Sequence, residues 1–99
     1  MVIKSVLKEE LRNSRQLKKR YESRLKALPK GSLVKKKIKN HQYYYLVLRD
    51  KGQVRFIYKG KTVSPAEKKK YAEAKKLRAK YRKLLSQVNK QIQFLEKSL

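Results

Sequence analysis

Apolar residues near the start of the chain recur every three or four positions, which is the repeat of an amphipathic helix. The stripe over residues 2–28 consists of Ile3, Leu7, Leu11, Ser14, Leu17, Tyr21, Leu25 and Leu28. It is narrow and contains a serine, which suits a helix–helix seam better than burial in a large core. Pro29 and Gly31 end this helix, because the residue before proline avoids helical geometry and glycine allows a positive φ.

A second helix is predicted over residues 65–98. Ser64 is placed as its N-cap, Pro65 fits the first helical position, and Glu67 completes a capping box. Its apolar stripe consists of Ala74, Leu77, Tyr81, Leu84, Leu85, Val88, Ile92, Leu95 and Leu99. The first half of the helix is densely basic, whereas residues 84–99 carry mostly amide and apolar side chains, which favours contact with protein at that end.

Between the helices, alternating and β-prone residues predict a three-stranded antiparallel meander over residues 32–59. The strands are expected at residues 32–38, 42–49 and 53–59. Asn40-His41 is expected at the first turn, because both residue types tolerate a positive φ. Asp50-Lys51-Gly52 is expected as a three-residue loop with Gly52 in the left-handed region.

Loop length decides which face of the middle strand each side chain joins, so the register stays open. A three-residue loop places the following residues beside Val54, Phe56 and Tyr58: Tyr44, Leu46 and Leu48. A two-residue loop places the other set there: Tyr43, Tyr45 and Val47. In either register most tyrosines are expected in the core, because so small a fold needs every ring it can bury.

The resulting fold class is α+β, with a long N-terminal helix, the meander and a long C-terminal helix in a single domain over residues 1–99. The helices are expected to pair as an antiparallel hairpin or coiled coil, or each with a second subunit. The second helix is longer, so its end is expected to find another partner, and a homodimer through the helices is one prediction.

The charge of the chain adds a prediction about function, namely that its surface binds a polyanion. The chain has 30 Lys and Arg against 7 Asp and Glu, a net charge of +23, and the cations are spread along its whole length. Such self-repulsion favours a polyanionic partner: nucleic acid first, then an anionic membrane surface, then an acidic protein. Double-stranded DNA is favoured over RNA. The predicted nucleic-acid-binding residues are Lys35, Lys36, Lys37, Lys39, Arg49, Lys51, Arg55, Lys59, Lys61, Lys68, Lys69, Lys70, Lys75 and Lys76.

Other chemistries lack the residues they need. The chain has no cysteine and one histidine, so neither a metal site nor a cofactor is expected, and His41 is interpreted as a turn residue. No acid is placed to pair with His41 or a nucleophile, so the protein is not expected to be an enzyme. No apolar run reaches the roughly 20 residues of a membrane span, and the N-terminus lacks a signal-peptide core. The cytoplasm is the expected compartment, without membrane partners.

Residues 28–60 resemble a family of short prokaryotic and mobile-element proteins without an assigned activity. These proteins join a helix to a hairpin with the pattern PKGSL…YYYL…YxG and then to a second charged helix. The matching residues are Pro29 to Leu33, Tyr43 to Leu46, Tyr58 and Gly60. Asn40-His41 departs from the Asn-Gly turn expected there. The basic strands are also loosely similar to the three-stranded arm-type DNA-binding domains of tyrosine recombinases, which is an analogy of fold.

Two functions therefore stand as hypotheses. The first is a non-enzymatic protein that binds nucleic acid, contacting phosphates through the meander and the basic half of the second helix. The alternative is an inhibitor or accessory factor that docks on a nucleic-acid-processing complex of a mobile element, phage or defence system. A buried aromatic sheet face with basic residues converging on one side favours the first, and an exposed aromatic face favours the second.

Overall fold

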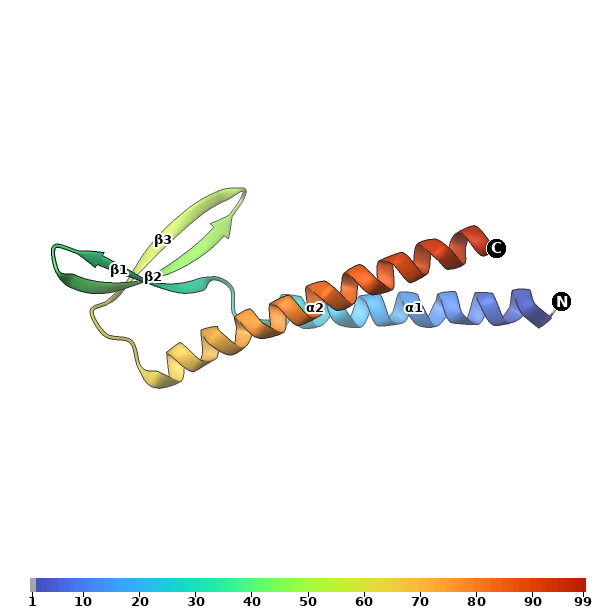
Figure 1. The fold of residues 1–99 in the computed structure, drawn as a ribbon, viewed down its shortest axis with the longest axis horizontal. Helices are drawn as coiled ribbons and strands as arrows, with labels where there is room; N and C mark the ends of the chain where they lie inside the picture. Colours follow the sequence, from blue (N-terminus) through green and yellow to red (C-terminus); the bar gives the residue numbers. More distant parts are fainter. Residues whose placement is uncertain (1) are drawn as a thin grey trace. The chain divides into compact units, whose positions relative to one another are not determined.

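A computed structural model describes residues 2–99 and has five elements (Figure 1). In chain order these are α1 (Val2–Ala27), β1 (Ser32–Ile38), β2 (His41–Asp50), β3 (Gln53–Gly60) and α2 (Pro65–Ser98). This confirms the α+β class and the predicted order of helix, meander and helix. The chain forms two compact units, which we call the helical unit (residues 2–28 and 77–99) and the sheet unit (residues 29–76).

In the helical unit, α1 pairs with the later part of α2 in antiparallel fashion, as the two apolar stripes predict. Its core is formed by Leu11, Val88, Ile92 and Leu95, with Leu7, Leu17, Tyr21 and Leu85 packed against them. Two contacts fix the direction: Arg15 pairs with Glu96 at 3.1 Å, and Arg24 donates a hydrogen bond to the Tyr81 hydroxyl at 3.3 Å. Residue numbers rise along one helix as they fall along the other, which is an antiparallel hairpin.

The seam between the two helices contains one small residue and a pair of aromatic residues, all of which belong to the predicted stripes. Ser14 is buried on α1, where a small side chain lets a neighbouring helix approach closely. Tyr81 is also buried, with its ring 6.0 Å from that of Tyr21. The buried positions confirm the prediction that the narrow apolar stripe of α1, with Ser14 inside it, forms a helix–helix seam.

The extra length of α2 is used differently from our expectation. The part of α2 from residue 77 onward belongs to the helical unit, and residues 65–76 belong to the sheet unit. The additional turns of the second helix are thus those at its N-terminal end, and the homodimer through the helices stays a prediction. These N-terminal turns of α2 contact side chains of the sheet unit, as the Glu67 carboxylate does with Lys59.

The start of α2 is capped as the sequence indicates. Ser64 Oγ accepts a hydrogen bond from the backbone N–H of Glu67 at 3.2 Å, and the Ser64 carbonyl accepts one from Lys68 N–H at 3.1 Å. The Glu67 carboxylate, which the capping box assigned to the Ser64 backbone, lies 3.5 Å from Lys59 Nζ.

The sheet has the strand order β1-β2-β3, with both pairs antiparallel (Figure 1). The first turn differs from the prediction, because its two residues are Lys39 and Asn40, with φ values of 48° and 66°. His41 is not a turn residue but the first residue of β2, opposite Ile38. Positive φ at both positions gives a type I′ turn, whose twist matches that of the flanking strands.

The second turn differs from the prediction as well, because it is shorter than the expected three-residue loop. Lys51 and Gly52 form it, with φ values of 50° and 79°, and Asp50 pairs with Gln53. The register is therefore the two-residue alternative, in which Tyr45 lies opposite Tyr58 and Val47 opposite Phe56. An irregularity between Tyr44 and Tyr45 interrupts this ladder and leaves Tyr44 opposite Gly60.

Strand alternation gives the sheet two different faces. The helix-side face, which meets residues 65–76 of α2, carries Leu33, Lys35, Lys37, Tyr44, Leu46, Leu48 and Ile57. The open face carries Val34, Lys36, Tyr43, Tyr45, Val47, Val54, Phe56 and Tyr58. Leu46 on the helix-side face is the one buried residue of the three strands.

The expectation that most tyrosines are in the core is wrong. Tyr81 is the one buried tyrosine, and Tyr58 is 56% exposed. The physical reason is that a single short helical segment meets one face of the sheet, so the rings that alternate onto the open face are left in contact with solvent.

No helix within residues 2–99 combines the length and the apolar character that crossing a membrane requires.

Candidate functional site

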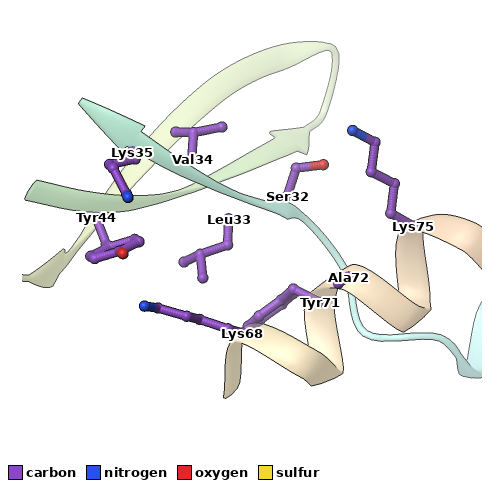
Figure 2. Close-up of a pocket in the computed structure, with 9 residues that line it drawn as sticks. All are labelled: Ser32, Leu33, Val34, Lys35, Tyr44, Lys68, Tyr71, Ala72 and Lys75. Carbon is purple, nitrogen blue, oxygen red and sulfur yellow. The ribbon is translucent and has the colours of Figure 1, made fainter. Parts of the chain in front are cut away.

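A pocket of about 470 Å³ lies in the sheet unit, between the helix-side face and the first turns of α2 (Figure 2). It is lined by Ser32, Leu33, Val34, Lys35, Tyr44, Lys68, Tyr71, Ala72 and Lys75. We call it the lysine–tyrosine pocket. It contains three ammonium groups and two phenols and no carboxylate, so its polar groups are suited to an anion.

Two local rules of geometry bring these side chains together. On the sheet, Lys35 lies directly opposite Tyr44 in the β1–β2 register, so the two side chains are cross-strand neighbours. On the helix, Lys68, Tyr71 and Lys75 are spaced three and four residues apart and therefore share one face. The pocket forms where the helix face meets this strand pair.

Two of the pocket's lysines lie close to the ring of Tyr44. Lys35 Nζ lies 5.6 Å and Lys68 Nζ 5.0 Å from the centre of its ring, and Figure 2 shows both side chains extending toward it. Both ammonium groups are attracted by the ring but repel each other. An anion that enters between them would remove that repulsion.

The same cations act on the Tyr44 hydroxyl. The pKa of Tyr44 lies below its ordinary value of 10.0, first because the Lys68 ammonium can donate a hydrogen bond to the phenolate oxygen. Desolvation opposes this shift, while the positive charges of Lys35 and Lys68 add to it. The Tyr44 hydroxyl thus lies beside two cations that favour its phenolate form.

Some of the predicted nucleic-acid-binding residues are held by carboxylates instead. Arg55 contacts Asp50 at 3.3 Å, and Lys59 contacts Glu67 at 3.5 Å. These pairs are partly solvent-exposed, so each is weak and can open, but its cation is less available than those of the pocket.

The remaining predicted residues are exposed and do not gather in the pocket. Lys36 and Arg49 lie on the open face, Lys39 and Lys51 lie in the turns, and Lys70 Nζ lies 5.6 Å from the ring of Tyr71. The others are also exposed, at Lys37, Lys61, Lys69 and Lys76. Of the fourteen predicted residues, the structure thus brings Lys35, Lys68 and Lys75 into one pocket.

Sequence reasoning did not single out the pocket's polar partners. Tyr71 could have been found from its helical spacing to Lys68 and Lys75, whereas Tyr44 and Ser32 required the strand register. A separate shallow hollow on α1, in the helical unit, also went unpredicted, and it is lined by Lys8, Leu11, Arg12, Arg15, Gln16 and Lys19.

Within residues 2–99, no three histidine and acidic side chains lie close enough together to hold a metal ion.

Comparison with protein-family models, with curated proteins and with solved structures finds no match to this chain. The resemblance of residues 28–60 to the mobile-element family therefore stays a prediction.

Proposed function

We propose that this protein is a non-enzymatic nucleic-acid-binding protein that contacts phosphates through its lysine-rich sheet and the first half of α2. The observation that carries the proposal is the lysine–tyrosine pocket, where Lys35, Lys68 and Lys75 line one cavity without a carboxylate. A phosphate oxygen can accept hydrogen bonds from ammonium groups and from a phenol at the same time.

The charge of the whole chain supports a polymer rather than a single small anion. A net charge of +23 raises the local concentration of any polyanion and releases counterions when phosphates are neutralised. The pocket offers no histidine or carboxylate as a general base, which supports binding rather than catalysis.

Salt-dependent binding to random-sequence DNA and RNA tests this function. The test variant replaces Lys35, Lys68 and Lys75 with glutamine. We expect the wild type to show a linear fall of log affinity with log salt, and the variant to lose about two to three units of slope on duplex DNA, as expected for about three phosphate contacts.

A matched control separates the pocket from net charge alone. Replacing Lys4, Lys90 and Lys97 with glutamine removes the same charge from exposed positions of the helical unit. Equal losses in the two variants would mean that charge acts without a local site, and a flat salt dependence in the wild type would exclude phosphate binding altogether.

The exposed aromatic rings of the sheet favour a second candidate, the accessory factor or inhibitor that docks on a nucleic-acid-processing complex. Phe56 and Tyr58 are 52% and 56% exposed, and aromatic residues are enriched at protein interfaces. Nucleic-acid affinity too weak to detect at physiological salt, combined with capture of one defined nucleic-acid-processing complex that Phe56→Ser abolishes, would select this function.

A further inference from the structure

The open face of the sheet carries a connected set of aromatic rings, of which Phe56 and Tyr58 on β3 are exposed and Tyr43 and Tyr45 on β2 are half-buried. The centre of the Tyr58 ring lies 5.6 Å from that of Tyr45, in an edge-on arrangement, and 6.1 Å from that of Tyr43. The His41 ring continues the row, with its centre 6.4 Å from that of Tyr43. Phe56, opposite Val47 on the same face, is 52% exposed. Side chains of this size normally pack into a core, and exposed rings gathered on one face, as Phe56 and Tyr58 are on β3, mark an interaction site.

A lysine lies among these rings. Lys36 Nζ is 4.1 Å from the centre of Phe56 and 5.4 Å from the centre of Tyr45. A cation held over an exposed ring is only weakly bound, and it can give way to a flat group that stacks on the ring. The displaced ammonium would then remain within reach of a negative charge next to that flat group.

The charge of the face argues against two other occupants. A second copy docked through this face would bring Lys36 and Arg49 of each copy together on chains of +23 net charge. A basic or neutral protein would leave Lys36 without a counter-charge at the centre of the interface. The sheet unit's three acids offer no compensation there: Asp50 and Glu67 pair with Arg55 and Lys59, and Glu73 lies on α2, which meets the other face.

We propose that the open face stacks unpaired bases of a single-stranded nucleic acid on Phe56, Tyr58 and Tyr45, with Lys36 contacting the adjoining phosphate. Bases in a duplex are stacked on each other and cannot lie flat on a protein surface, whereas unpaired bases can. The inference rests on the proposed nucleic-acid binding and specifies its ligand. It replaces the preference for duplex DNA that the sequence suggested.

The test compares a single strand, the matching duplex, and an abasic single strand of the same length and phosphate number. The variant Phe56→Leu/Tyr58→Leu keeps apolar side chains on the edge strand but removes two rings. The control Phe94→Leu removes a ring that is 67% exposed on α2 in the helical unit. Circular dichroism establishes that all three proteins are equally folded.

We expect the wild type to bind the single strand more tightly than the abasic strand. The double variant should lose about 5- to 150-fold in affinity for each stacked base on the single strand and nothing on the abasic strand or the duplex, while the control should match the wild type. Ultraviolet crosslinking to the single strand should label peptides that contain Phe56 or Tyr58.

Each other result overturns the inference. Equal affinity for normal and abasic strands, with the salt dependence intact, would refute stacking but leave phosphate binding in place. No affinity for any of the three ligands would refute both proposals. A concentration-dependent dimer that Phe56→Leu/Tyr58→Leu dissociates would assign the face to a second copy instead.

Discussion

Lys68 Nζ lies 5.0 Å from the centre of the Tyr44 ring, although one residue comes from a helix and the other from the central strand. This contact predicts an early titration of Tyr44. In the wild type, the absorbance change of phenolate formation should begin below the ordinary pKa of 10.0. Lys68→Met should move this first step to higher pH, because it removes the largest cause of the shift.

Two variants control this titration. Tyr44→Phe should delete the early step, and Lys69→Met, at an exposed neighbouring position, should leave it in place. An early step that survives Tyr44→Phe would belong to another of the 7 tyrosines and contradict the assignment.

The same shift predicts how phosphate binding depends on pH. Below its lowered pKa, Tyr44 is neutral and can donate a hydrogen bond to a phosphate; above it, the phenolate repels the phosphate. Affinity for nucleic acid should therefore begin to fall as the pH rises toward the Tyr44 pKa. Tyr44→Phe should bind more weakly at neutral pH and lack this early fall, measured by anisotropy at constant ionic strength.

The wild type and Tyr44→Phe share every other titrating group, so the difference between their two pH profiles is the relevant quantity. Parallel pH profiles for the two proteins would exclude Tyr44 from the phosphate contact.

Gly31 and Gly52 form a matched pair for a test of the sheet unit. Both have positive φ, of 97° and 79°, so alanine is strained at either position. A Cβ at Gly31 would also lie 2.6 Å from Leu48 Cδ2 and 3.0 Å from the Val47 carbonyl oxygen, whereas one at Gly52 meets nothing within 4 Å. We expect Gly52→Ala to lower the free energy of unfolding by about 1 kcal/mol and Gly31→Ala by about 2–4 kcal/mol.

Denaturant unfolding followed by far-ultraviolet circular dichroism measures both. Equal effects of the two substitutions would mean that the contacts of Gly31 with Leu48 and Val47 are relieved by movement of the strand end.

Leu95 is one of the core residues of the helical unit, where it is 5% exposed. Leu95→Ala should lower the free energy of unfolding by about 2–4 kcal/mol through lost burial and a residual cavity. Its sequence neighbour Phe94 is 67% exposed, so Phe94→Ala should change stability by less than about 0.5 kcal/mol. Thermal melts of the two variants check the helical pairing, and a reversed order would contradict it.

Local patterns were sufficient for the elements. Three predictions that depend only on neighbours a few positions away are confirmed: the stripe through Leu11 and Ser14, the helix cap at Ser64, and the strand at residues 53–59. The helical half of the candidate site was readable for the same reason, because Lys68, Tyr71 and Lys75 share a face by spacing alone.

What the sequence determined by itself is thus the order and type of the elements and the strongly positive net charge, since both follow from local spacing and composition. The tertiary structure decided the registers. A first turn at Lys39-Asn40 instead of Asn40-His41 shifts each strand partner by two residues, and this is what puts Tyr44 rather than Leu46 opposite Lys35. A two-residue second turn puts Tyr45 and Tyr58 on one face, and that face stays open because the helix meets the other. Both turns depend on backbone angles of Lys39 and Lys51 that no lysine favours by itself, so the twist and pairing of the whole sheet select them.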